Sequence, residues 1–278
     1  MYRIYINRNN PTHRDVISAF ADGMEPRFEL VQYNPSGPNF KRPSEGDKVI
    51  IFGIQNDHME ERVRASQIID TVGIENCLII ELGFIDRRHS FMVGWGGLNG
   101  RADFRTEGVE GDRWGALRTE LQPIRTDGDY ILVAGQVYND STIKNVDFQQ
   151  WANETCEEIA KHTDKPIIFR RHPLDRHFKA PQGTIRSDIK LNADLQRSCA
   201  VVTYSSNLGV DAVVAGLPVY AADKGSMVYN LANKSLNNID KWTLDENQRV
   251  EWAHKLAYSQ WSCDEMRRGL PHKRLGIN

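Results

Sequence analysis

Short apolar runs of strand length alternate with longer amphipathic stretches along most of this chain. Val49–Phe52 and Ile131–Ala134 are runs of the first kind, whereas residues 59–72 carry apolar side chains at roughly helical spacing. This alternation is typical of βαβ units around a mostly parallel sheet. With 278 residues, the chain is long enough for two domains. We therefore predict an α/β fold with two halves of similar size.

The two predicted halves meet at a stretch of weak periodicity. Between Arg87 and Arg125 the alternating pattern gives way to Gly, Arg and aromatic residues. An irregular stretch of this length is usually functional or lies at a domain junction. We place the boundary near Thr126, which divides the chain into residues 1–125 and 126–278.

The predicted elements follow the apolar runs. Strands are expected in the first half at residues 2–6, 48–52 and 77–81. In the second half strands are expected at residues 130–134, 166–170, 200–204 and 217–221, with a helix over 147–162. Two segments fit the capping box that opens a helix, namely Thr243–Glu246, before a helix to about Gln260, and Ser262–Glu265.

Composition and motif content exclude several classes of protein. The hydrophobic fraction of 40% and the formal net charge of -2 are ordinary for a globular protein and exclude wholesale disorder. No apolar run approaches the ~20 residues that span a bilayer, and the N-terminus lacks the features of a signal peptide, so a cytoplasmic protein is expected. The four cysteines occur singly, which indicates buried thiols rather than a disulfide scaffold or zinc site. Phosphate-loop, zincin and α/β-hydrolase motifs are absent.

A hydroxyl-rich turn follows the predicted strand at residues 200–204. Ser205 and Ser206 lie where the next helix begins, and Gly209 follows shortly after. Free amides, the helix dipole and two hydroxyls at the carboxyl end of a parallel strand are suited to an anion such as a diphosphate. The alternative is that the serines only cap the helix, which is the commoner role of serine at this position.

A second candidate site is the basic segment after the strand at residues 166–170. Arg170, Arg171 and His172 lie at the end of this strand, and Lys165–Lys190 holds seven Lys or Arg against two Asp. Positive charge of this density favours a phosphate or polyanion, and strand ends are where α/β sheets bind ligands. The alternative is a solvated charged face.

Two carboxylates are the candidates for acid–base chemistry. Glu81 ends a predicted strand, and Asp103 closes a glycine-rich loop, so either could lie in a cleft. Each could equally form a salt bridge with a nearby arginine. The loop is not a dinucleotide fingerprint, because Asn99 stands where the third glycine should be.

Taken in order, several segments resemble the capsule polysaccharide biosynthesis family, the sugar transferases similar to bacterial capsular Kdo transferases. The resemblance covers about Cys77 to Tyr220. The matching segments are Glu81–Phe84, Gly135–Ile143, Arg171–Asp175, Ser205–Gly209 and Ala215–Val219. This resemblance implies a GT-B architecture: two Rossmann-like domains facing a cleft, the C-terminal one holding a nucleotide sugar, UDP- or CMP-linked, with no metal or other cofactor required.

The resemblance also assigns roles to residues. The residues expected to bind the donor, with the two arginines added from the charge argument, are Gln136, Asp140, Ser141, Arg170, Arg171, His172, Ser205, Ser206 and Gly209. His172 and Arg171 would stabilise the charge that develops on a leaving phosphate. Glu81 or Asp103 would act as general base or nucleophile, the two roles of carboxylates in glycosyl chemistry.

The acceptor is predicted from the irregular stretch. Residues 258–269 look like the endings of phage-encoded proteins, and phages use soluble glycosyltransferases on hydroxymethylated pyrimidines in DNA. The expected acceptor-binding residues are Arg87, Arg88, Trp95, Asn99 and Arg101. Seven arginines interleave with four aromatic residues, as suits the gripping of phosphate and the stacking of a flipped base. These are Arg87, Arg88, Arg101, Arg105, Arg113, Arg118 and Arg125, with Phe91, Trp95, Phe104 and Trp114. Five acids reduce this charge to +2.

Three other functions stay open at this point. The acceptor could be a capsule or surface glycan instead of DNA. A nucleotide-sugar 2-epimerase shares the fold and would convert its donor without an acceptor. The third is a nucleotide- or DNA-binding module without catalytic activity.

Overall fold

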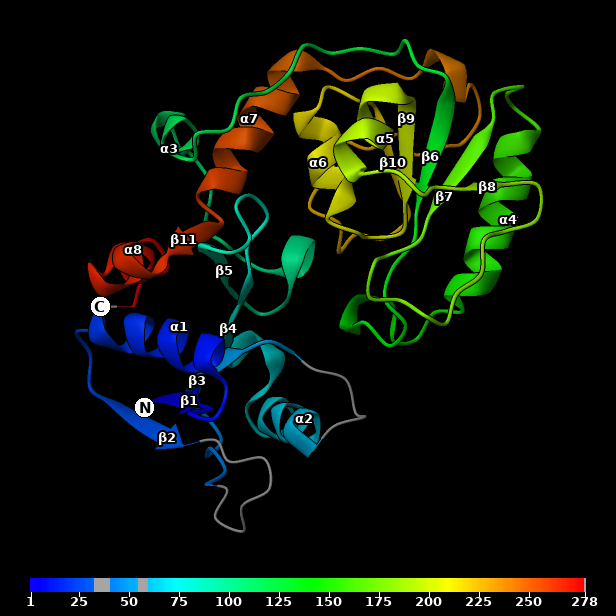
Figure 1. Ribbon diagram of the computed structural model, residues 1–278. Coiled ribbons are helices and arrows are strands. Elements are labelled where there is room, and N and C mark those ends of the chain that lie inside the picture. The colour runs from blue at the N-terminus through cyan, green and yellow to red at the C-terminus, as the bar shows by residue number, and fades with distance from the viewer. Residues whose placement is uncertain (33–40, 55–59, 278) are drawn as a thin grey trace. The chain divides into compact units, whose positions relative to one another are not determined.

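The computed structural model describes residues 1–32, 41–54 and 60–277, and these form two compact units (Figure 1). Unit 1 comprises Met1–Leu117 and His254–Asn278, and unit 2 comprises Arg118–Ala253. The predicted division differs in two respects: the units divide between Leu117 and Arg118 and not near Thr126, and the C-terminal residues 254–278, predicted in the second half, lie in unit 1. They belong to unit 1 because their apolar side chains complete its core.

Unit 1 contains a six-stranded sheet in the order β11-β5-β4-β3-β1-β2. The strands are β1 (Tyr2–Ile6), β2 (Phe28–Gln32), β3 (Lys48–Phe52), β4 (Cys77–Leu82), β5 (Ser90–Trp95) and β11 (Gln260–Ser262). Strands β1 to β4 pair in parallel, whereas β5 and β11 are antiparallel to their neighbours. The predicted strands at 2–6, 48–52 and 77–81 are confirmed. β2, β5 and β11 were missed; β5 lies in the stretch that we expected to be irregular.

Helices cover both faces of the unit 1 sheet, as the alternation of its strand residues requires. Ile4, Ile50 and Ile80 face helix α1 (Pro11–Asp22) in one cluster. The intervening Tyr5, Val49 and other residues pack with helix α2 (Glu60–Val72) in a second cluster on the other face. The predicted helix at 59–72 is therefore confirmed, apart from Met59, which lies outside the described residues.

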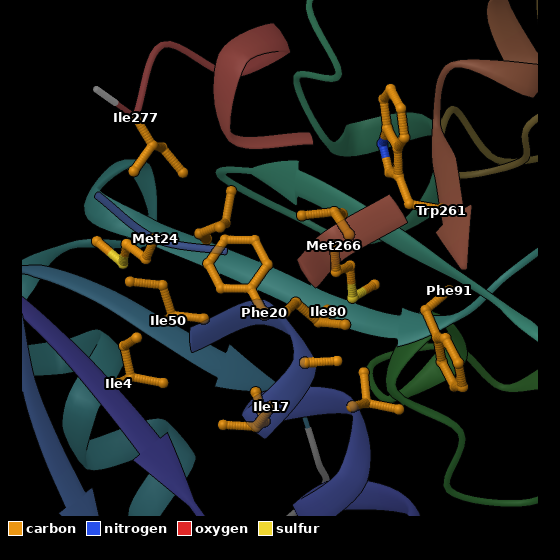
Figure 2. Packing of buried hydrophobic residues seen from close by; sticks show 14 of the residues in the cluster. Ile4, Ile17, Phe20, Met24, Ile50, Ile80, Phe91, Trp261, Met266 and Ile277 are labelled. Atoms are coloured by element: carbon orange, nitrogen blue, oxygen red, sulfur yellow. The ribbon is translucent and has the colours of Figure 1, made fainter. Parts of the chain in front are cut away.

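The C-terminal segment is part of the first of these clusters. Figure 2 shows Trp261, Met266 and Ile277 packed beside Phe20 and other residues of the first hundred. Burying a side chain of this size contributes roughly 1.5–3 kcal/mol. The last strand and helices of the chain are therefore a structural part of unit 1.

Unit 2 contains a five-stranded parallel sheet in the order β10-β9-β6-β7-β8. The strands are β6 (Tyr130–Ala134), β7 (Ile167–Arg170), β8 (Ile185–Arg186), β9 (Ser198–Thr203) and β10 (Val219–Ala221). Helix α4 (Phe148–Ala160) covers one face, and Asp147 caps it by accepting the amide of Gln150. All four strands and the helix predicted for this half are present, within one to two residues at most ends.

The other helices are short except for α7. They are α3 (Asp112–Ala116), α5 (Leu191–Arg197), α6 (Leu208–Val214), α7 (Glu246–Ala257), α8 (Cys263–Arg267) and α9 (Leu270–Arg274), with 3-10 turns η1 (Ile74–Asn76), η2 (Asn99–Arg101), η3 (Ser141–Ile143) and η4 (Ile239–Lys241). Among the described residues, no helix is long and apolar enough to cross a membrane.

Of the two predicted capping boxes, one is present. Ser262 and Glu265 form the reciprocal pair of hydrogen bonds at the start of α8. The box predicted at Thr243–Glu246 is wrong, because Asp245 accepts the amide of Gln248 and so caps α7. The helix also ends at Ala257, before β11, and not near Gln260.

Candidate functional site

The strand order of unit 2 reverses direction between β6 and β9. The chain runs from β6 outward to β7 and β8, then returns to the other side of β6 for β9 and β10. In open parallel sheets, ligands bind beyond the carboxyl ends of the strands where this direction reverses. The residues directly after β6 and β9 therefore define the candidate site.

Gln136 and Ser205 join the two loops at this reversal point. The Gln136 Oε1 accepts the Ser205 amide at 2.9 Å, and its Nε2 donates to the Ser205 Oγ at 3.2 Å. Nε2 also lies 3.1 Å from the Thr142 Oγ1, which donates to the Asp140 Oδ1 at 2.7 Å. Gln136 and Ser205 are 5% and 6% exposed. A buried polar network whose members all have partners fixes its loops in one geometry.

The structure thus unites three of the predicted donor residues, Gln136, Asp140 and Ser205, in one network. Ser141 lies between Asp140 and Thr142 in the chain, at the start of η3, and is half-buried. Ser206 instead accepts the Leu208 amide at 3.3 Å, which is the capping role considered as its alternative. Helix α6 has only seven residues. The anion site predicted at its start therefore depends on the network and not on the helix.

Gly209 has a packing role. A Cβ at this position would lie 2.8 Å from a methyl carbon of Val228, so no larger residue fits without displacing that side chain. Gly209 is buried.

The basic segment after β7 divides into one structural residue and two candidates. Arg170 donates to Asp194, which is 1% exposed, and also to Ser187 and the carbonyl of Ile189. This guanidinium neutralises a buried carboxylate, so the geometry does not favour the predicted role of Arg170 in donor binding. The next two residues, Arg171 and His172, are half-buried at the carboxyl edge of the sheet.

The ring of His172 has a defined orientation. Its Nδ1 accepts a hydrogen bond from the Leu174 amide at 3.2 Å. A neutral imidazole with an accepting Nδ1 carries its hydrogen on Nε2. In that tautomer Nε2 is the donor atom of the His172 ring.

The two predicted catalytic carboxylates lie at opposite edges of the unit 1 sheet. Glu81 is near the carboxyl end of β4, where its Oε1 accepts the Leu82 amide at 2.8 Å. Asp103 pairs with Trp95, which is opposite Leu78 near the amino end of β4. Three residues along a strand correspond to about 10 Å. The side chain of Asp103 is 63% exposed and accepts the amide of Arg105. The two carboxylates therefore do not share a site.

The predicted acceptor residues are divided in the same way. Arg87 and Arg88 are exposed in the loop after β4, at the carboxyl edge, whereas Asn99 and Arg101 follow β5 to the amino edge. The two groups are separated because β5 runs antiparallel to β4 and leads the chain back to the end of the sheet where β4 begins. Trp95 is 8% exposed, and its Nε1 donates to the Leu275 carbonyl, so it is a core residue.

Several residues that were expected to bind DNA are buried or bind other residues of the protein. Phe91 and Phe104 are 4% and 7% exposed and cannot stack on a base. Arg113 binds Glu265 and lies 3.9 Å above the Trp261 ring. Arg125 donates to the carbonyls of Ser198 and other residues of unit 2. Three of the four aromatic residues are therefore core residues and two of the seven arginines are anchored, whereas the other five arginines, Arg87, Arg88, Arg101, Arg105 and Arg118, are exposed.

Three residues at the carboxyl edges were missed by the sequence reasoning. Thr142 completes the network of unit 2, and Asp175, which is 1% exposed, accepts the amides of Tyr138 and Phe178. A lone Thr or Asp in a turn gives no signal of such a role. In unit 1, the His13 Nδ1 accepts the Asn7 amide at 3.0 Å beside β1, where that sheet reverses direction. A polar residue directly after a buried strand was the available signal.

No group of three His, Cys, Asp or Glu able to hold a metal occurs in residues 1–32, 41–54 and 60–277. The three cysteines at 77, 156 and 199 are buried thiols, and Cys263 is partly exposed.

Comparison with solved structures reveals the fold relationship. The β-Kdo 2,4-transferase of Thermosulfurimonas dismutans KpsC superposes with a TM-score of 0.57 at 14% identity, covering 91% of this chain and 89% of that one. The β-Kdo 2,7-transferase of the same protein gives 0.51 at 12% identity, covering 98% and 99%. This chain has their GT-B-like fold. The expected resemblance to capsular Kdo transferases is confirmed at the level of structure.

Other comparisons add little. Methanocaldococcus jannaschii UDP-GlcNAc 2-epimerase matches with a TM-score of 0.32 at 12% identity, covering 86% of this chain and 90% of that one, which is too distant to support an argument. No family model and no curated protein matches the sequence.

Proposed function

We propose that the protein is a glycosyltransferase that moves a sugar from a nucleotide-sugar donor to an acceptor hydroxyl. One observation carries the proposal: Gln136 and Ser205 hydrogen-bond across the reversal point of a parallel sheet, at its carboxyl edge. Unit 2 would bind the donor, and unit 1 the acceptor. The GT-B-like fold, seen in two transferases of activated sugars, supports this division.

The residues at the edge suit the departure of a nucleotide. In sugar transfer the leaving phosphate gains charge, and fixed donors stabilise it. Arg171 supplies a guanidinium, and His172 supplies the Nε2 hydrogen described above. Glu81, at the carboxyl edge of unit 1, is our candidate for the carboxylate that removes the acceptor proton or attacks the sugar. Asp103 is not proposed for this role, because it lies at the other edge.

The test compares two buried glutamines. Thermal unfolding of the wild-type protein is measured with CMP, UDP and their sugars, because a ligand that binds only the folded state raises the melting temperature. Gln136→Ala should abolish the shift given by the effective nucleotide. Gln260→Ala is the matched control: Gln260 is fully buried in unit 1 and accepts the amides of Phe84 and Ile85. It should lower stability and leave the nucleotide-induced shift intact.

Two outcomes would contradict the proposal. No shift with any nucleotide or sugar would remove the donor site and favour a non-enzymatic role. A nucleotide sugar that is converted at C2 without any acceptor would instead identify an epimerase. Transfer or hydrolysis of the sugar from the nucleotide that gives the shift is the result that we expect.

A further inference from the structure

An exposed pair of stacked rings lies next to the Gln136 network. The rings of Tyr138 and His177 have centroids 3.8 Å apart and are inclined by 23°. Tyr138 follows Gln136 by two residues, which limits their Cα separation to about 7 Å. Tyr138 is nevertheless 48% exposed, although aromatic rings of this size are usually buried. Aromatic surface of Tyr138 and His177 is thus accessible to solvent at the carboxyl edge of unit 2.

The pair is held in place by a buried carboxylate. Asp175 accepts the Tyr138 amide with Oδ1 at 3.1 Å and the Phe178 amide with Oδ2 at 3.0 Å. A single side chain therefore ties the loop after β6 to the loop after β7. The ring of Phe178 is 7% exposed and packs edge-on against both Tyr138 and His177. Rings fixed in this way lose little conformational entropy when a ligand stacks on them.

We propose that the exposed face of Tyr138, supported by His177, stacks on the heterocyclic base of the nucleotide. Any of the nucleic-acid bases can stack on an aromatic side chain, because each base has a π-face. The Gln136 network and His172 would lie toward the phosphate and sugar, and the Tyr138 face toward the base. This inference rests on the proposed function and adds the residue that recognises the nucleoside part of the donor.

The test separates the base from the rest of the ligand. The affinity of the full chain is measured by calorimetry for CMP and UDP, and for ribose 5-phosphate, which has no base. Tyr138→Ala should weaken nucleotide binding about tenfold or more, the usual loss when a stacking ring is removed. Its affinity for ribose 5-phosphate should equal that of the wild type. Tyr138→Phe retains the ring and should bind nucleotides as the wild type does.

A control and two contrary outcomes complete the design. Ile185→Ala removes another exposed apolar side chain, 60% exposed on strand β8, and should leave both affinities unchanged. Unchanged nucleotide affinity in Tyr138→Ala would overturn the stacking proposal and leave the donor site intact. If the wild type binds no nucleotide, the stacking proposal and the proposed function both fail.

Discussion

At the residue scale, two carboxylates that look alike in the sequence have different surroundings. Glu81 is partly buried at the carboxyl end of a parallel strand. Asp103 is exposed, and its carboxylate accepts the Arg105 amide in a local turn. Ligands of α/β sheets bind at carboxyl edges. Position in the sheet therefore distinguishes a candidate for chemistry from a residue that stabilises a turn.

We expect Glu81→Gln to lower the rate of sugar transfer by about 10²- to 10⁴-fold, the usual contribution of a general base. Donor affinity should be unchanged, since the donor site is proposed for the other unit. Asp103→Asn should transfer sugar at the wild-type rate. Steady-state kinetics at saturating donor would decide; equal losses in both variants would contradict the assignment of Glu81.

The contacts between candidate site residues were harder to predict than the candidates themselves. Ser205 could be identified because it follows a strand-length apolar run, and Gln136 was assigned through the family resemblance. Their contact depends on strand order, which local patterns do not contain. The aromatic residues were misassigned for a related reason: Trp95 and Phe104 stand among glycines and arginines, and burial in unit 1 comes from elements far away in the chain.

At the element scale, most strands were predictable because they are short apolar runs bounded by polar residues. β5 was not, since Gly94 interrupts its apolar run and two further glycines follow the strand directly. A fully buried strand followed by glycines resembles an irregular segment when only periodicity is considered. Because β5 was not predicted, the reversal of chain direction that places Glu81 and Asp103 at opposite ends of β4 could not be predicted either.

The start of α7 gives a test at this scale. Asp245→Ala removes the side chain that accepts the Gln248 amide and should lower the free energy of unfolding by about 1 kcal/mol. Thr243→Ala should change it by less than about 0.5 kcal/mol, as is usual for substitutions that remove no cap or buried contact. Urea unfolding followed by circular dichroism measures both. A larger loss in Thr243→Ala would restore the capping box that the sequence pattern suggested.

At the scale of the whole molecule, we expect unit 1 to lose stability in acid because it contains two buried histidines. Burial lowers the pKa of His13 and of His272 to about 4. An unfolded histidine has a pKa of about 6.5, so between these values the unfolded state binds more protons. The contribution of the two histidines to the free energy of unfolding is therefore fully present above about pH 6.5 and decreases as the pH falls toward 4.

His272→Gln should flatten this pH dependence. Its amide can replace the Nε2 that hydrogen-bonds the Phe20 carbonyl at 2.9 Å, but it takes up no proton. The control is His89→Gln, since the His89 side chain is 74% exposed. Urea unfolding across the window from about pH 4 to 6.5 gives the slopes. A slope in His272→Gln as steep as in the wild type would assign the acid sensitivity elsewhere.

The division into units predicts how fragments behave. Residues 118–253 should unfold cooperatively alone, because unit 2 is continuous in sequence. Residues 1–117 should not, because the core would lack Trp261, Met266 and Ile277. The same segment joined to residues 254–278 by a Gly/Ser linker should regain a cooperative transition in circular dichroism. Cooperative unfolding of residues 1–117 alone would show that the C-terminal segment is dispensable.

The discontinuity of unit 1 also sets the order of events during synthesis on the ribosome. The 136 residues of unit 2, 118–253, are made before the segment that completes unit 1. At about 5–20 residues per second, this takes about 7–27 s. During that interval β5 has no β11 beside it, and one face of the first sheet is only partly covered. The first half of the nascent chain therefore exposes an open strand edge and apolar surface while unit 2 is synthesised, and these features make a folding intermediate prone to aggregation.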